Sequence, residues 1–307
     1  MLAILLFACS GGDTDTTKDT TGDSGLVQGD YLSEDVDLGS PTFEASTVAA
    51  AVDSALSQVL DINAVPVVSL YTAFMDATTE SCPQWTTFDE YPVWLDSCTT
   101  EDGVTFDGYG LMLEYDGFES DGAIYSGYQI NSLGAMSAPD GSTLTLAGAV
   151  DLLYAVGKGY EVFYTNISDG TAWDGAATGT WLDWGINPAM YFYALRDTTS
   201  GARSVQVSGS VSIEDGDISA VVFDGLYLLD DPSGTLCSAE PSGMISILSA
   251  EGQWYDLVFD GPTEDNTTVP EETCDGCATA WFKGEALGEA CVDFSALVDW
   301  DDNPWGL

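Results

Sequence analysis

The sequence contains no histidine and only five lysine and arginine side chains among its 307 residues. Without histidine the chain cannot form a Ser-His-Asp or Cys-His nucleophilic site, or a zinc site with imidazole ligands. Acid–base catalysis near neutral pH would therefore require a carboxylate, tyrosine, lysine or cysteine with a shifted pKa.

The few basic residues stand against 51 aspartate and glutamate residues, which gives a formal net charge of −46. Nucleic acid is excluded as a partner, because its binding needs basic side chains that replace counterions. Repulsion among the carboxylates opposes the compact state, and salt weakens that repulsion. We expect an acidic surface that serves solubility or adaptation to salt.

Weak Ca²⁺ binding is the one cofactor interaction that the acidic loops suggest, because Ca²⁺ prefers six to eight oxygen ligands. None of these loops fits the EF-hand pattern, and such clusters also arise by chance in so acidic a chain. We otherwise expect no cofactor and no specific metal site. The acidic clusters lie at residues 13–15, 35–37, 214–217, 230–231 and 299–302.

Long apolar runs are also missing, since no segment approaches the roughly 20 residues that a membrane-spanning helix needs. A short apolar run from Leu2 to Ala8 ends at Cys9 and is followed by Ser10-Gly11-Gly12. This segment resembles the lipobox of bacterial lipoproteins, in which the cysteine is lipidated and becomes the mature N-terminus. The alternative is a buried N-terminal strand that contains Cys9.

The lipoprotein resemblance covers residues 1–12 and carries several implications. Residues 1–8 would be a signal segment, and the membrane would be a partner through lipid attached to Cys9. Ser10 after the cysteine is similar to the residue that directs lipoproteins to the outer membrane. The resemblance therefore implies a cell-envelope protein anchored on the periplasmic or surface-exposed side.

Six further cysteines are present, an even number that favours three disulfides outside the cytoplasm. Proximity along the chain favours the pair 82–98. A bond 277–291 would join two strands of a hairpin, and a bond 237–274 would close the hairpin before it. The close pair 274 and 277 could instead be a redox motif or half of a zinc site. The six are Cys82, Cys98, Cys237, Cys274, Cys277 and Cys291.

Composition divides the chain into three parts. Residues 9–30 are rich in Gly, Asp, Thr and Ser, and this predicts a disordered acidic tether that follows the signal segment at 1–8. Residues 31–307 are predicted to form a single β-rich domain, whose C-terminal portion from about residue 232 is stapled by disulfides.

One amphipathic helix is predicted over residues 41–60. Val48, Val52, Ala55, Leu56 and Val59 recur at spacings of three and four, so that one face is apolar. We expect this face to pack on a sheet, although an interaction helix is an alternative.

The remaining chain has the pattern of β-strands, with Asp-Gly dipeptides that supply the positive φ angles of tight hairpins. Short connections predict antiparallel neighbours. The expected fold is mainly β, a large antiparallel meander sheet, curved or partly closed, with one N-terminal α-helix packed on it. The expected strands are 67–74, 104–115, 123–130, 142–156, 160–167, 190–195, 204–213, 218–229, 245–248, 254–259, 278–282 and 290–294.

A tryptophan-rich segment supplies the candidate ligand-binding residues Trp173, Asp174, Trp181, Asp183 and Trp184. Aromatic rings flanked by carboxylates can stack on sugars and accept their hydroxyl hydrogen bonds, and paired carboxylates can hydrolyse glycosides. The alternative is ordinary packing within a sheet. The leading hypothesis is a non-enzymatic binding or structural module whose partner is a carbohydrate or an envelope protein. The alternative hypothesis is a carboxylate-dependent glycoside hydrolase or carbohydrate-binding protein.

Overall fold

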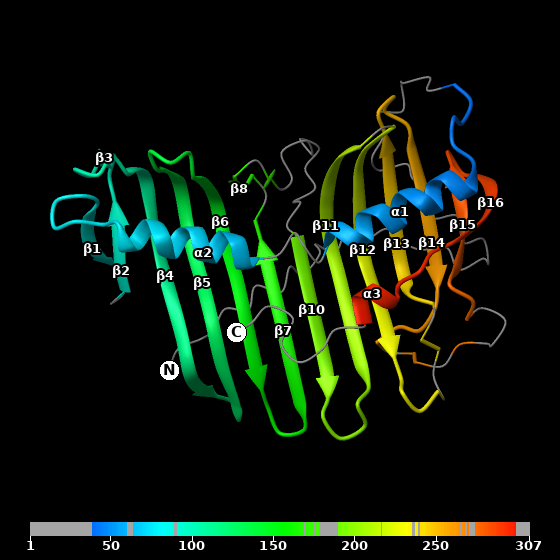
Figure 1. The fold of residues 1–307 in the computed structure, drawn as a ribbon. Helices are drawn as coiled ribbons and strands as arrows, with labels where there is room; N and C mark the ends of the chain where they lie inside the picture. Colours follow the sequence, from blue (N-terminus) through cyan, green and yellow to red (C-terminus); the bar gives the residue numbers. More distant parts are fainter. Residues whose placement is uncertain are drawn as a thin grey trace, which may run out of the picture.

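The computed structural model describes most of the chain after residue 38. Figure 1 shows one broad sheet with three helices lying across one of its faces. The predicted signal segment and the predicted tether lie outside the described residues. These are 39–59, 64–88, 91–168, 170–174, 176–177, 190–215, 217–234, 237–238, 240–264, 266–267, 269 and 274–298.

The sheet has 16 strands within the described residues, and its strands pair antiparallel in a nearly unbroken meander. Its two ends, β1 and β16, do not pair with each other in the part of the chain that the structure describes, so the sheet is open. The prediction of a mainly β antiparallel meander is confirmed. The main path is β1 (Gln84–Phe88), β2 (Tyr91–Leu95), β4 (Thr105–Ser120), β5 (Ala123–Ser137), β6 (Thr143–Val156), β7 (Tyr160–Ile167), β10 (Met190–Asp197), β11 (Arg203–Asp215), β12 (Ile218–Asp230), β13 (Ser242–Ser249), β14 (Trp254–Asp260), β15 (Cys277–Phe282) and β16 (Glu285–Cys291), with the short β3 (Cys98–Thr99), β8 (Ala172–Trp173) and β9 (Ala176–Ala177) beside it.

Helix α1 (Ala45–Val59) confirms the predicted amphipathic helix. Its apolar stripe, which includes Val48 and Val52, is fully buried against the β11–β16 half of the sheet (Figure 1). The last helix, α3 (Ser295–Val298), lies on the same face, where Arg203 of β11 donates a hydrogen bond to the carbonyl oxygen of Val298.

Helix α2 (Ala64–Asp76) shows that the strand predicted at 67–74 is wrong. The valines at 67 and 68 favour a strand by intrinsic propensity. The buried positions nevertheless recur at helical spacing, at Ala64, Val67, Val68, Tyr71 and Phe74. Pro66 stands in the first turn, where the helix tolerates proline. Packing of this stripe on β5, β6 and β7 therefore outweighs the propensity of the valines.

The C-terminal hairpin corrects a second prediction, because its return strand is Glu285–Cys291 and not 290–294. Lys283 and Gly284 both adopt positive φ, 49° and 76°, and form the two-residue turn that places Phe282 opposite Glu285. The sequence pattern did not reveal this strand, because Glu285 and Gly288 are unusual strand residues. The hairpin β1–β2 was also missed.

Three disulfides join the cysteines in the pairs that the sequence favoured: Cys82–Cys98, Cys237–Cys274 and Cys277–Cys291. The alternatives of a redox pair or a zinc half-site at 274 and 277 are therefore wrong, since each sulfur is bonded elsewhere. The three disulfides indicate a non-reducing environment outside the cytoplasm. Of the helices that the structure describes, none combines the length and apolar character needed to cross a membrane.

Candidate functional site

The tryptophan-rich segment is only partly described, and its described residues are structural. Trp173 in β8 pairs with Leu144 of β6 and is only 7% exposed, so its ring belongs to the core. Asp174 has φ of +41°, and its carboxylate accepts a hydrogen bond from the backbone N–H of Thr143 at 3.0 Å. Trp181, Asp183 and Trp184 lie outside the described residues.

The sheet surface opposite the helices, which we call the far face, carries a row of polar side chains. Gln129 of β5 lies opposite Asp151 of β6, Asp151 opposite Asn166 of β7, and Asn166 opposite Tyr191 of β10. Residues directly opposite in neighbouring strands point to the same side of a sheet. The row therefore points away from α1 and α2, because the alternate positions, such as Ile130, belong to the core under the helices.

Asp151 is the centre of this row and is only 5% exposed. The side-chain amide of Gln129 donates to its Oδ1 at 2.8 Å, and that of Asn166 donates to its Oδ2 at 3.3 Å. Burial raises the pKa of Asp151, and these hydrogen bonds, with one from Tyr164, lower it in part. The carboxylate is thus fixed in place, and it orients the amide on each side.

Tyrosine rings surround the row. The hydroxyl of Tyr115 donates to Gln129 Oε1 at 3.3 Å, and the rings of Tyr164 and Tyr191 meet edge to face at 5.5 Å. Burial raises the pKa of Tyr191 to about 12 and that of Tyr193 in the same direction, so both phenols remain neutral donors near pH 7. We call the set Tyr115, Gln129, Asp151, Tyr164, Asn166, Tyr191 and Tyr193 the tyrosine face.

Sequence reasoning missed the tyrosine face because its members come from five strands. The pair Tyr191 and Tyr193, two residues apart in a strand-like run, was the one available signal that tyrosines share a side of the sheet. No spacing in the sequence shows that this pair lies beside Asp151.

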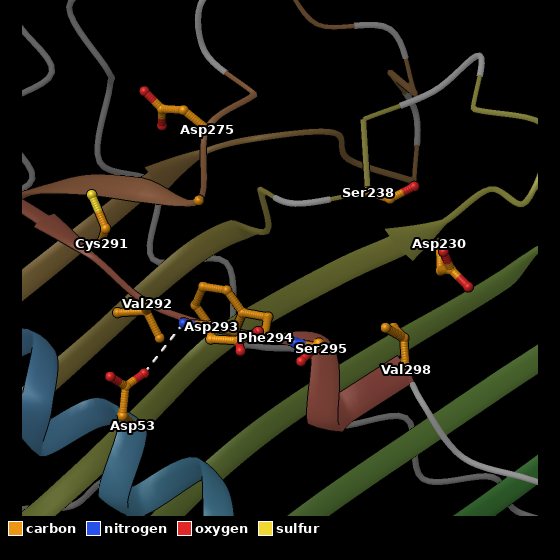
Figure 2. A pocket seen from close by; sticks show the side chains of 11 residues that line it. Asp53, Asp230, Ser238, Asp275, Cys291, Val292, Asp293, Phe294, Ser295 and Val298 are labelled. Atoms are coloured by element: carbon orange, nitrogen blue, oxygen red, sulfur yellow. Dashed lines mark hydrogen bonds between the residues drawn. The ribbon is translucent and has the colours of Figure 1, made fainter.

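A hollow lies between α1, α3, the end of β12 and β16, with a cavity volume of about 630 Å³ (Figure 2). Its lining includes Asp53, Asp230, Asp275 and Asp293. The backbone N–H of Asp293 donates to Asp53 Oδ1 at 3.2 Å. Asp275 and Asp230 lie on opposite sides of the hollow in Figure 2, so the four carboxylates do not converge on one point.

The carboxylates around this hollow also serve local turns. Asp275 Oδ1 accepts the N–H of Cys277 at 3.0 Å, and Asp293 Oδ1 accepts the N–H of Ser295 at 2.9 Å. Hydrogen bonds from the side chain and the backbone N–H of Ser295 lower the pKa of Asp293. In the predicted calcium loop 230–231, Asp231 accepts hydrogen bonds from the N–H and the hydroxyl of Ser233. These carboxylate oxygens therefore already accept hydrogen bonds from other groups of the chain.

One group of three metal-ligating atoms within 4.8 Å of one another occurs among the described residues, at Cys277, Glu289 and Cys291. Its two sulfurs form a disulfide and so cannot bind metal as thiolates. The acidic loops 13–15, 35–37 and 299–302, and the side chains at 214–216, lie outside the description. Calcium binding stays a prediction for those segments.

Two other buried carboxyl groups have raised pKa values. Burial raises the pKa of Asp256 to about 6, although Ser246 donates a hydrogen bond to its Oδ1 at 2.6 Å. Burial, together with the charges of Asp260 and Asp275, raises the pKa of Glu240 to about 7. Both side chains are fully buried, with 0% exposure.

The two buried carboxyl groups of the far face, those of Asp151 and Asp256, stand too far apart to act on one bond. Asp151 lies on β6 and Asp256 on β14, six strand steps apart. At a strand spacing of 4.7–4.9 Å this separation is about 29 Å along the sheet, whereas the paired carboxylates of glycosidases stand about 5–10 Å apart.

No family model, curated protein or solved structure matches this chain.

Proposed function

We propose that this protein is a non-enzymatic binding module of the bacterial cell envelope, and that its tyrosine face binds a polyhydroxylated ligand such as a neutral glycan. The observation that carries the proposal is the Asp151 carboxylate held between two side-chain amides and bordered by tyrosine rings. Such rings pack on the C–H faces of sugars, while amides and carboxylates bond their hydroxyl groups.

Charge narrows the class of ligand. A net charge of −46 repels acidic polysaccharides and anionic lipid surfaces. Neutral sugars carry no such penalty and can use both the neutral phenols and the oriented amides of the tyrosine face.

The spacing of the carboxylates supports binding over glycoside hydrolysis. Asp151 and Asp256 are six strand steps apart, and Glu240 is fully buried. The tyrosine face includes one carboxylate, Asp151, whose two oxygens already accept amide hydrogen bonds. The exposed carboxylate of Glu264 is near enough for its charge to raise the pKa of Tyr191 and Tyr193, but a hydrolase of this chemistry needs two carboxyl groups that are free to act on the same bond.

Attachment to the outer membrane through lipid on Cys9 completes the proposal. The lipobox-like segment at residues 1–12 motivates it, and the three disulfides agree with a location outside the cytoplasm. More than one acyl chain gives a stable anchor.

Co-sedimentation with insoluble neutral polysaccharides tests the binding function. We expect Tyr191→Ala and Asn166→Ala each to raise the dissociation constant by about tenfold or more, as truncation of central contact residues does. Tyr109→Ala is the control, because Tyr109 is 47% exposed on the same face of β4 but lies outside the row. Failure of the unmodified protein to bind any neutral glycan, or loss of binding only in the control, would contradict the proposal.

Cell fractionation tests the anchor separately. Cys9→Ala removes the acceptor of the lipid, so we expect the protein to leave the membrane fraction and appear in the soluble fraction. If the variant stays with the membranes, the anchor assignment is wrong, whatever the glycan assay shows.

A further inference from the structure

Strand β1 forms one end of the sheet, and its outer edge has no partner strand among the described residues (Figure 1). All five of its residues are exposed. Trp85 and Phe88 are 48% and 66% exposed, which is unusual for side chains of this size. An edge strand of this kind offers unpaired N–H and C=O groups to another chain.

The opposite edge of the sheet is protected. Strand β16 carries Glu285 and Glu289, and Gly288 with φ of +130° lies beside a register shift in its pairing with β15. Helix α1 also packs on β16. Charges, irregular backbone and a covering helix are the usual devices that prevent edge pairing. Strand β1, with the sequence QWTTF, has no charged residue and no proline.

Charge decides which partner fits this edge. Two copies of a chain with net charge −46 repel each other wherever their acidic surfaces meet. Strands β1 and β2 contain no charged side chain. Asp89 and Glu90 join the two strands and Asp96 follows β2, so the acidic residues of this region stand at the strand ends, and two copies can pair along β1 without placing like charges directly opposite each other. A basic partner would find no complementary carboxylate on these two strands.

An apolar row extends from the same edge across the far face. Leu95 of β2 lies opposite Tyr109 of β4, which lies opposite Leu133 of β5, and Leu95 lies opposite Gln84 of β1. The three large side chains are 37%, 47% and 54% exposed. The apolar surface beside the edge therefore spans β2, β4 and β5.

We propose that β1 pairs antiparallel with β1 of a second copy, about a two-fold axis at Thr86. This arrangement places Thr86 opposite Thr86, Trp85 opposite Thr87 and Gln84 opposite Phe88. Threonine pairs and aromatic–β-branched pairs are favourable across strands. The same surface patch then serves both subunits, as a two-fold interface requires.

Sedimentation velocity of the purified full chain in 0.05 M and 0.5 M NaCl tests the proposal. We expect a dimer whose dissociation constant falls as salt rises, because screening weakens the repulsion between the two acidic bodies. Thr86→Lys sets two like charges against each other at the axis, so the dissociation constant should rise by about tenfold or more. Thr279→Lys is the control, because Thr279 is an exposed threonine on β15.

Hydrogen exchange on the unmodified protein gives a second measurement that needs no variant. The amides of residues 84–88 should gain protection as protein concentration rises, in step with the dimer fraction. The proposal fails if the protein is monomeric in both salts, if Thr86→Lys dimerises as well as Thr279→Lys, or if a dimer forms without protection of β1. Association only with an added basic peptide, and more weakly at high salt, would also overturn it.

Discussion

At the scale of single residues, Asp256 shows how burial determines a pH dependence. Its carboxyl group is fully buried, Ser246 satisfies one oxygen, and its pKa in the folded protein is about 6 against a reference value of 3.8. The folded state therefore binds a proton more tightly than the unfolded state does. The free energy of unfolding therefore falls as the pH rises from about 4 to about 6, because the group must ionise while it is buried. Above that range the group lowers the free energy of unfolding by a constant amount.

Asp256→Asn removes the charge that the site disfavours, and its carbonyl oxygen can still accept the hydrogen bond from Ser246. A shift of about two pKa units corresponds to about 3 kcal/mol. We expect the variant to gain up to this amount over the unmodified protein at pH 7.5 and to gain little at pH 4. Urea unfolding at both pH values measures the difference.

Asp116→Asn is the control for this prediction, because Asp116 is an exposed carboxylate on β4. It removes one charge from the surface without affecting a buried site. A stability gain from Asp256→Asn that is equal at the two pH values, or no larger than that from Asp116→Asn, would contradict the explanation by burial.

At the scale of elements, α2 depends on one buried hydrogen bond to the sheet. The indole N–H of Trp94 in β2 donates to the hydroxyl of Tyr71 at 2.8 Å, and both side chains are fully buried. A Cβ on Gly110 of β4 would stand 2.9 Å from that hydroxyl and 2.8 Å from the indole nitrogen, so the helix can dock here because position 110 has no side chain.

Tyr71→Phe removes the acceptor and leaves the Trp94 N–H buried without it. We expect a loss of about 1–3 kcal/mol in the free energy of unfolding, the usual cost of an unsatisfied buried donor. Tyr109→Phe, at an exposed tyrosine on β4, should change stability by much less. Chemical denaturation of the three proteins measures both effects, and equal losses in the two variants would show that the hydrogen bond is unimportant.

The elements differ in how far the sequence could predict them. Strands β4 to β6 were predictable because Asp121-Gly122 and Asp140-Gly141 mark their turns, and Asp121, Gly122 and Gly141 do adopt positive φ. Helix α2 was not predictable, because the intrinsic propensity of its valines favours a strand. Only packing of one side of this segment on the sheet makes the helix the preferred structure. The tyrosine face depends on cross-strand register, which a single sequence does not reveal.

At the scale of the whole molecule, the main feature is an excess of negative charge. Arg196 and Glu161 form an ion pair, and the chain has only five basic side chains against 51 acidic ones. Arg196 also lies opposite Arg203, and Arg203 opposite Asp230. Most carboxylates are therefore held in the folded state without a cationic partner, and their mutual repulsion lowers stability.

We expect salt to stabilise the domain for this reason. The Debye length falls from about 10 Å at 0.1 M to about 3 Å at 1 M salt, so repulsion between surface carboxylates weakens over this range. The melting temperature should rise between low salt and about 0.5 M NaCl, by roughly 2–4 °C for each 1 kcal/mol of repulsion relieved.

Thermal melts in NaCl, and in CaCl₂ at equal ionic strength, separate screening from specific binding. Equal shifts in the two salts indicate screening alone, whereas a larger shift in CaCl₂ indicates calcium sites that stabilise the folded state by mass action. A melting temperature that stays flat in both salts would show that carboxylate repulsion does not limit the stability of this fold.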